Sequence, residues 1–399
     1  MARGEFRARS GRHPGGAIHN AAMADAGRSS LGELAAVFLK LGTISFGGPA
    51  AHIALMRVEV VERRRWLTDQ AFLDLVGATN LIPGPNSTEM AIHIGFIRGG
   101  WPGLVTAGLC FIGPAALIVW LLAVVYVRVG QLPALAAGFH GIKAVVVAIV
   151  AAALWKLART AVTSVWLAAL GVVAAIGLVA GVHELLVLLI CGVVAALVRV
   201  RLRGTTTAAA IGPLATSLLA LPAAAVIPVN LPELFTVFAK AGAFLFGSGY
   251  VLVAFLRADL VERLHWLSEQ QLLDAIAVGQ FTPGPVFTTA TFIGYTLAGT
   301  PGAVVATVAI FVPAFVYVAI SGPVVPRLRA SALASGALDG VNVASLALMA
   351  VVTWHIARAA LVDPTSAALA AASLGLLAWR INPAWLIAAG AVVGLLMHR

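Results

Sequence analysis

The two halves of this 399-residue chain repeat the same uncommon residues at a nearly constant spacing. The spacing is 200 residues from Pro83 to Pro283 and falls to 199 from Gly95 to Gly294. Unrelated apolar helices share Leu, Val and Ala, but they do not align Trp, Pro and Gly at one offset. Further matches are Phe46-Gly47-Gly48 with Phe246-Gly247-Ser248, Trp66 with Trp266, Pro83-Gly84-Pro85 with Pro283-Gly284-Pro285, and Trp155 with Trp354. The chain is therefore predicted to consist of two related structural repeats.

Apolar runs of nearly membrane-crossing length recur in both halves. Hydrophobic residues make up 61% of the chain and charged residues 11%, which leaves too little polar surface to cover a water-soluble fold. Crossing the hydrocarbon core of a bilayer takes roughly 20 apolar residues. The runs that reach or approach this length are 104–127, 144–155, 165–180, 185–198 and 304–320. We expect an all-α, multi-pass protein of a bacterial inner membrane, with the lipid bilayer as its main surroundings.

Composition divides the chain into four parts. Residues 1–30 carry five arginines and no apolar core of signal-peptide length, so they are expected to form a basic cytoplasmic tail. Residues 31–203 form the first repeat and residues 231–399 the second. Residues 204–230 link them, and we expect a connecting transmembrane span there because their apolar stretch has no counterpart in the first half.

Basic residues in the predicted loops indicate how the repeats are oriented. In the first half they gather on the side of the basic tail, whereas at the matching loops of the second half several disappear and others arise on the opposite side. This shift favours two inverted repeats, with a parallel duplication as the alternative. The net charge of +10 comes from the tail and from the ends of apolar runs, so nucleic-acid binding is not expected.

Each Pro-Gly-Pro triplet must break the helix that contains it. Proline has no backbone N–H group and clashes with the preceding helical turn. Inside a bilayer such a break is tolerated where protein or water surrounds it, so two matched breaks favour one central site between the repeats. The new helix after each break presents unpaired N–H groups that suit an anion. A purely structural kink is the alternative interpretation.

A second pair of breaks is expected at Gly47-Gly48-Pro49 and Gly247-Ser248-Gly249. Small residues there let backbone amides approach a ligand closely, although tight helix packing would require the same residues. The residues predicted to bind the anion are Lys40, Phe46, Gly47, Gly48, Pro83, Gly84, Pro85, Asn86, Ser87, Thr88, Lys240, Gly247, Ser248, Gly249, Pro283, Gly284, Pro285, Thr288 and Thr289.

Charged residues near the breaks are the remaining candidates. Lys40 and Lys240 occupy matched positions in apolar helices, where a lysine either serves the site or extends its ammonium group to the membrane surface. Glu89 follows the first Pro-Gly-Pro break and has a threonine as its counterpart. It is predicted to carry protons or, alternatively, to cap the new helix.

Four further polar positions belong to the predicted site region. Asp74 and Asp274 are matched candidates for proton coupling and for pairing with the two lysines. Lys143, whose counterpart is Asn342, and His93 are weaker candidates because a polar group in a span often serves only a neighbouring helix.

No sequence pattern points to catalysis. The chain has no HExxH, phosphate-loop or GxSxG motif, and its two cysteines lie far apart in apolar runs. We therefore assign no catalytic residue, no metal ligand and no cofactor, and we expect an ion gradient to supply the energy.

The same motifs resemble those of the chromate ion transporter superfamily, in its long-chain, two-domain form. The residues that carry the likeness are Phe46 to Pro49, Val61 to Leu67, Asn80 to Gly95, and Trp155 with Arg159. The resemblance covers about residues 31–399 and implies two homologous halves of opposite orientation. Glu89 departs from the pattern of many chromate exporters, which often have glutamine there.

The resemblance implies a secondary transporter that exports chromate, a tetrahedral oxyanion, under the proton motive force and so confers heavy-metal resistance. Sulfate is the expected competitor. Transport of sulfate or another anion, import instead of export, and passive conduction by an anion channel are the alternatives. A homodimer is an open alternative to a single working chain.

Overall fold

The computed structural model describes residues 29–46, 48–80, 82–129, 133–202, 229–245, 251–379 and 381–397. The predicted basic tail, nearly all of the predicted linker 204–230, and the site candidates Gly47, Gly247, Ser248 and Gly249 lie outside these residues. The described part of the chain is built from helices and contains no strand.

The elements of the first half recur in the same order in the second. The first half contains α2 (Leu31–Ile44), α3 (Pro49–Arg57), η1 (Val58–Arg63), α4 (Asp69–Thr79), α5 (Asn86–Val129), α6 (Pro133–Ala161), α7 (Val165–Val179) and α8 (Glu184–Leu202). The second contains α9 (Leu231–Phe244), α10 (Leu252–Leu256), η2 (Arg257–Arg263), α11 (Glu269–Phe281), η3 (Val286–Thr288), α12 (Thr289–Ala330), α13 (Ala332–Ala360), α14 (Pro364–Ala378) and α15 (Pro383–Met397). The predicted all-α fold of two repeats is confirmed.

Matched local signals start and stop these elements. The side chains of Ser30 and Asn230 accept hydrogen bonds from the first turns of α2 and α9, and Thr68 and Ser268 do the same for α4 and α11. Such N-caps satisfy backbone donors that have no partner inside the helix. The repeats therefore share capping chemistry at positions where the residue types differ.

Both repeats also contain one turn of π-helix, η1 and η2, at the same position. Each is followed by a residue with positive φ, Arg65 at 51° and His265 at 52°. Single π-turns are rare in proteins and frequently lie at functional sites. Their conservation between the two halves indicates that both repeats need this local geometry.

Helices α5 and α12 are sharp hairpins and not single rods. Gly100 has φ 61° and Gly299 has φ 63°, a backbone region that glycine adopts without strain. The two arms then touch along glycines: a Cβ on Gly95 would lie 2.4 Å from the carbonyl oxygen of Gly103, and Gly294 meets Gly302 in the same way at 2.3 Å. The matched glycines of the sequence thus permit two tight hairpins.

Four helices in the described part of the chain are long and apolar enough to cross a bilayer. They are Asn86–Arg128, Ala137–Ala161, Val286–Ser321 and Leu333–Ala360. Shorter apolar helices are Val165–Val179, Pro364–Ala378 and Pro383–Leu396.

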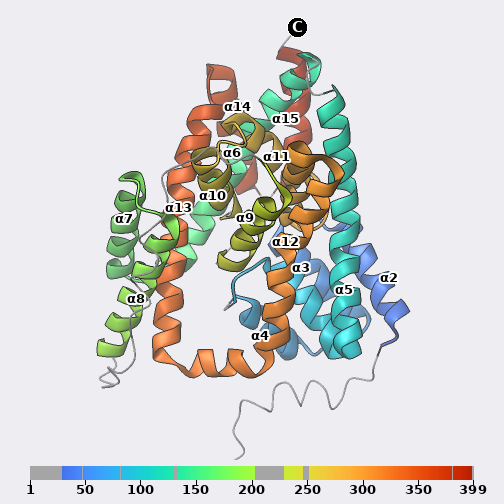
Figure 1. Cartoon of the computed structure of the whole chain (residues 1–399), viewed down its shortest axis with the longest axis vertical. Helices are drawn as coiled ribbons and strands as arrows, with labels where there is room; N and C mark the ends of the chain where they lie inside the picture. Colours follow the sequence, from blue (N-terminus) through green and yellow to red (C-terminus); the bar gives the residue numbers. More distant parts are fainter. Residues whose placement is uncertain are drawn as a thin grey trace, which may run out of the picture.

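The two repeats exchange their last helices. In Figure 1, α7 and α8 of the first repeat lie beside α13 of the second, whereas α14 and α15 of the second lie around α6 of the first. A Cβ on Gly141 of α6 would lie 2.0 Å from the carbonyl oxygen of Gly390 on α15. On the other side, a Cβ on Gly340 of α13 would lie 2.1 Å from the carbonyl oxygen of Cys191 on α8. The exchange therefore rests on two equivalent close crossings.

A single methyl group should disturb one of these crossings. We expect Gly340→Ala to lower stability by about 1–3 kcal/mol, because the new Cβ meets backbone that cannot turn away. Thermal unfolding of the purified protein in detergent measures this change. The matched control is Gly113→Ala in α5, where a Cβ meets nothing within 4 Å, and its melting temperature should stay the same or rise slightly. Equal melting temperatures for the two variants would contradict the close crossing.

Candidate functional site

Two hydrogen bonds connect the Pro-Gly-Pro breaks to the opposite repeat. The backbone N–H of Gly84 donates to the carbonyl oxygen of Leu245 at 2.8 Å, and the N–H of Gly284 donates to the carbonyl oxygen of Ser45 at 2.8 Å. Leu245 and Ser45 each follow the first helix of their repeat, at the start of the second kind of break. We call this pair the cross-repeat hydrogen bonds. They bring the ends of broken helices from both repeats to one place.

The glycines of both triplets are required by their surroundings. Gly84 and Gly284 have φ of 137° and 86°, which side chains disfavour. A Cβ on Gly84 would lie 2.3 Å from Glu89 Oε1, and one on Gly284 would lie 2.5 Å from the Cβ of Ala115. Both Pro-Gly-Pro loops are therefore tightly enclosed by neighbouring side chains.

Polar side chains at the start of α5 are buried beside the first triplet. Ser87, Thr88 and Glu89 are 2%, 0% and 0% exposed. Neither oxygen of Glu89 has a hydrogen-bond partner among the described residues, and the Thr88 hydroxyl also has none. Buried polar atoms without partners are rare in proteins, so these atoms are candidates for contact with a ligand or an ordered water. Nearby, Asn86 donates to Asn80 across the break at 2.6 Å.

His52 was not predicted as a site residue, yet it lies between two breaks. Its Nδ1 is 3.2 Å from the hydroxyl oxygen of Ser87, and its ring is 1% exposed. It also forms a hydrogen bond with the backbone of Ser45, whose carbonyl receives one of the cross-repeat hydrogen bonds. Its repeat counterpart is Leu252, so a search for matched polar residues passes over it.

The second repeat starts its post-break helix differently. The hydroxyls of Thr288 and Thr289 donate back to the carbonyl oxygens of Pro285 and Val286, each at 2.8 Å. Here the buried polar atoms without partners in the described structure are Gln280 Nε2, just before the break, and Ser45 Oγ, at the other end of a cross-repeat hydrogen bond. With Thr88, these groups supply three hydrogen-bond donors near the breaks.

A line of polar side chains continues from Glu89 between α5 and α12. His93 lies one turn after Glu89, and its Nε2 is 3.3 Å from the hydroxyl oxygen of Ser321 on α12. One turn before Ser321, the hydroxyl of Tyr317 donates to the carbonyl oxygen of Ala243 at 2.9 Å. Groups of this kind can pass a proton along the interface between the two hairpins.

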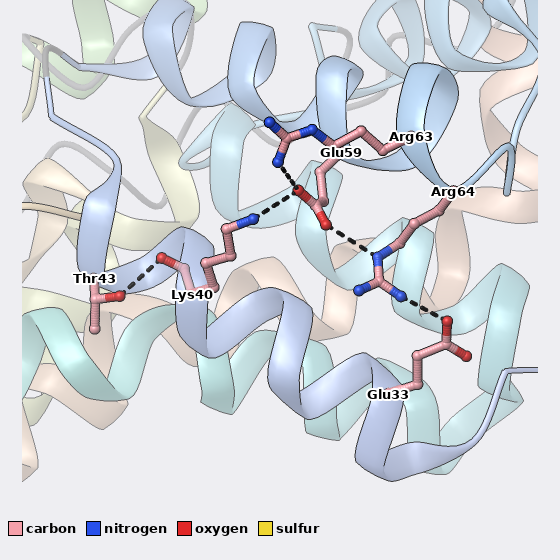
Figure 2. Close-up of polar contacts among 6 residues, drawn as sticks. All are labelled: Glu33, Lys40, Thr43, Glu59, Arg63 and Arg64. Carbon is pink, nitrogen blue, oxygen red and sulfur yellow. Dashed lines mark hydrogen bonds and ion pairs between the residues drawn. The ribbon is translucent and has the colours of Figure 1, made fainter.

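The two predicted lysines are held by the π-helical turns. Figure 2 shows Lys40 donating to Glu59 at 3.0 Å, while Arg64 bridges Glu59 and Glu33. Burial raises the pKa of the Glu59 carboxyl, but hydrogen bonds from Lys40 and Arg64 outweigh it and hold that pKa below its ordinary value. Glu59 is therefore charged, and Lys40 balances it.

The second repeat has the equivalent arrangement. Lys240 pairs with Asp259 at 2.5 Å, and Asp259 is the counterpart of Glu59 on η2. Lys240 also pairs with Glu184 of α8 at 3.3 Å. The pairs Lys40–Glu59 and Lys240–Asp259 link each first helix to the π-turn of its own repeat, and the pair Lys240–Glu184 links α9 to the first repeat.

The predicted pairing of Lys240 with Asp274 is wrong. Asp274 pairs instead with Lys143 of α6 at 2.9 Å and accepts a hydrogen bond from the hydroxyl of Tyr126 at 2.7 Å. Asp74 accepts a hydrogen bond from Gln70 at 3.2 Å, and Lys40 is engaged by Glu59. The ion pairs follow contacts between distant helices, which the matched spacing does not encode.

The remaining candidates are placed as follows. Gly48 has φ 81° where α3 begins, and Phe46 before it is 38% exposed. Pro83 is half-buried, while Pro85, Pro283 and Pro285 are buried. No group of three or more His, Cys, Asp or Glu side chains in the described part of the chain is arranged to hold a metal ion.

Comparison with known proteins gives one family. The chromate transporter family model matches residues 32–196 and 232–395, one region in each repeat. The chain is 32% identical to a chromate transport protein of Cupriavidus metallidurans over 92% of this chain and 94% of that protein. It is 34% identical to a probable chromate transport protein of Synechococcus elongatus, over 84% of this chain and 86% of that protein.

A chromate transport protein of Pseudomonas aeruginosa is 32% identical over 82% of this chain and 81% of its own length. No solved structure matches the chain. The apolar helices and the family matches mark a multi-pass membrane protein of a transporter family, as its motifs predicted. The chain belongs to the chromate transporter family.

Proposed function

We propose that this protein is a secondary active transporter that exports chromate across the inner membrane under the proton motive force. The observation that supports the proposal is the pair of cross-repeat hydrogen bonds, which joins the Pro-Gly-Pro break of each repeat to the end of the first helix of the other. Buried donors without partners among the described residues lie close to these positions in the sequence. The printed names of the relatives support chromate as the substrate.

The donors suit a tetrahedral oxyanion. The hydroxyls of Ser45 and Thr88 and the side-chain amide of Gln280 can each donate one hydrogen bond to an oxygen of the anion. The first turns of α5 and α12 add backbone N–H groups and the positive ends of two helix dipoles. Because all of these donors are neutral, they bind an anion without placing a full positive charge in the bilayer.

Glu89 gives this site a means of coupling to protons. Its carboxylate lies against Gly84 with no cation paired to it in the described structure, so a bound anion and an ionised Glu89 repel each other. A proton on Glu89 removes this repulsion, so proton binding and anion binding favour each other. A dianion that leaves with one proton still carries net negative charge outward, and an inside-negative membrane potential drives that movement.

We further propose that the repeats are inverted. In Figure 1 the long arm of α5 rises to the top of the view as the sequence advances, whereas the long arm of α12 descends. The shift of basic residues between matching loops supports the same arrangement. Inverted repeats allow a central site to face either side of the membrane in turn.

Purified protein in proteoliposomes tests the proposed transport. We expect chromate counterflow, together with chromate accumulation against its gradient that stops when a protonophore is added. Sulfate should compete, because it is a dianion of similar shape. Robust flux of another anion without chromate flux would contradict the substrate, and chromate movement that never opposes its gradient would indicate a passive channel.

Replacing Glu89 tests the coupling. We expect Glu89→Gln to abolish the pH dependence of chromate transport while chromate binding stays measurable, because the amide keeps the shape but cannot titrate. The measurement is the initial rate at several pH values in proteoliposomes. The matched control is Glu62→Gln on η1, whose carboxylate is 50% exposed and remote from the breaks in sequence. A pH profile of Glu89→Gln that equals the profile of the control would remove Glu89 from the mechanism.

We propose that Lys40 and Lys240 affect anion binding indirectly, because their ion pairs fix the first helix of each repeat on its π-turn. We expect Lys40→Met to lower the melting temperature with little change in the KM for chromate. Lys240→Met should be more destabilising, on the order of 3 kcal/mol, because the buried carboxylates of Asp259 and Glu184 both lose a cation. Exposed Lys156 provides the control, Lys156→Met. A large rise in KM at an unchanged melting temperature would instead mean that the lysine touches the anion.

A further inference from the structure

Matched helices of the two repeats differ in how deeply they are buried. In α11, every residue from Leu272 to Gln280 is buried. In α4, which occupies the same position in the first repeat, the buried residues are Phe72, Ala78 and Thr79. The largest contrast is at Leu73, which is 59% exposed, while its counterpart Leu273 is fully buried. Within the described part of the chain, the same structural unit is therefore fully packed in one repeat and only partly packed in the other. We call the partly packed helix α4 and its neighbours the uncovered unit.

The difference lies in what each helix packs against. Helix α11 packs against α6, α13 and α15 as well as against the hairpin α12 of its own repeat. By the repeat correspondence, α4 would pack against α13, α6 and α8, but its main contacts in the described part of the chain are with α5. The apolar cores show the same division. One core joins α9, α10 and α11 to α6, α7, α8 and α13, and a separate one contains only α2 to α5 and η1.

An ion pair holds the packed helix in place. Lys143 of α6 and Asp274 of α11 are 2.9 Å apart, and their side chains are 12% and 10% exposed. Lys143 also donates to Gln270 at 2.8 Å, and Tyr126 of α5 donates to Asp274 at 2.7 Å. These four side chains come from three helices, α5, α6 and α11. The ion pair joins α6 of the first repeat to α11 of the second. An ion pair buried this deeply is costly to separate, so it fixes α11 firmly.

A second ion pair also connects the two repeats. Glu184, at the first residue of α8, pairs with Lys240 of α9, next to the packed unit. At the matching positions of the uncovered unit, Pro383 stands where the carboxylate would be, and Asn342 stands where Lys143 would be. Asp74 and Gln70 of α4 retain the residue types that grip Lys143 in the other repeat. The uncovered unit thus has the carboxylate and the amide that would bind a lysine, but Asn342 stands where that lysine would be.

We propose that Lys143 and Asp274 form a gate pair that closes the α11 side of the molecule, and that α4 is the matching gate, open in this structure. The inference rests on the proposed transport function and assigns Lys143 as a positioning residue. During transport the gate pair separates, α11 leaves α6, and α4 packs against α13 in the equivalent place. The lysine at 143 and the asparagine at 342 set which gate is closed at rest.

Thiol accessibility tests the gate without any transported anion. Cysteines replace Leu73 or Leu273 in the full chain, with Cys110→Ser to remove the half-buried native thiol. A small charged methanethiosulfonate reagent is added to membrane vesicles, and peptide mass spectrometry gives the modification rate at each position. Native Cys191, which is 3% exposed, reports on general loosening. Because no substrate is present, the outcome is independent of which anion the protein carries.

The gate pair predicts specific rate changes. Lys143→Asn should raise the modification rate at position 273 at least tenfold and leave Cys191 unchanged. The charge-reversed double variant Lys143→Asp with Asp274→Lys should bring the rate back to within threefold of the original. Lys156→Asn, on the exposed end of the same helix, should change neither position.

Asn342→Lys gives a second and independent test. When α4 packs against α13, the new lysine would meet Asp74 and Gln70, the residue types that bind Lys143 in the other repeat. The modification rate at position 73 should therefore fall severalfold. An unchanged rate at 273 in Lys143→Asn would overturn the proposal. If Lys143→Asn raises the modification rates at position 273 and at Cys191 equally, the variant has loosened the whole protein, and Asn342→Lys becomes the deciding test. In that case an unchanged rate at position 73 would overturn the proposal.

Discussion

Lipid cannot hydrogen-bond to the backbone, and this constraint governs the centre of the structure. Each Pro-Gly-Pro break frees N–H and carbonyl groups that a continuous helix would have paired. The protein satisfies two of them reciprocally: Gly84 donates to Leu245 and Gly284 donates to Ser45. One repeat alone contains a donor at its triplet and an acceptor at its other break, but the bonds form only between repeats. The duplication therefore does more than double a unit, because each half completes the other.

The candidate site follows from this reciprocity. The hydroxyls of Ser45 and Thr88 and the amide of Gln280, which lie near the breaks in the sequence, are buried and have no hydrogen-bond partner among the described residues. The two repeats have diverged within this shared frame. The first contributes Glu89, His52 and His93, whereas the second has threonines whose hydroxyls turn back to their own backbone. Titratable groups are thus concentrated in one repeat, and the other supplies mainly backbone geometry and packing.

The sequence predicts those features whose cause is local. Two prolines around a glycine must interrupt a helix, so the triplets and the repeat were predictable from residue type and spacing. The hairpin turns at Gly100 and Gly299 were not predicted, because single glycines and prolines also lie within the helices of this chain. The partners of charged residues were not predictable either. Lys40 of α2 meets Glu59 of η1 across the break that separates α2 from α3, and Lys143 meets Asp274 because α11 packs against α6. His52 was not predicted as a site residue, because its contact with Ser87 depends on where α3 lies and it has no matched polar residue in the second half.

The exchange of terminal helices bears on how such a protein is made. Helices α7 and α8 are synthesised with the first repeat, yet the surface that covers them belongs to α13. Helix α6 likewise reaches its final packing, including the close contact at Gly141, only after α14 and α15 have been synthesised. Insertion of α6, α7 and α8 into the membrane must therefore precede their final packing, which needs helices of the second repeat. Severing the chain between the repeats would not yield two stable halves, but co-expressed halves would retain every surface they need to find each other.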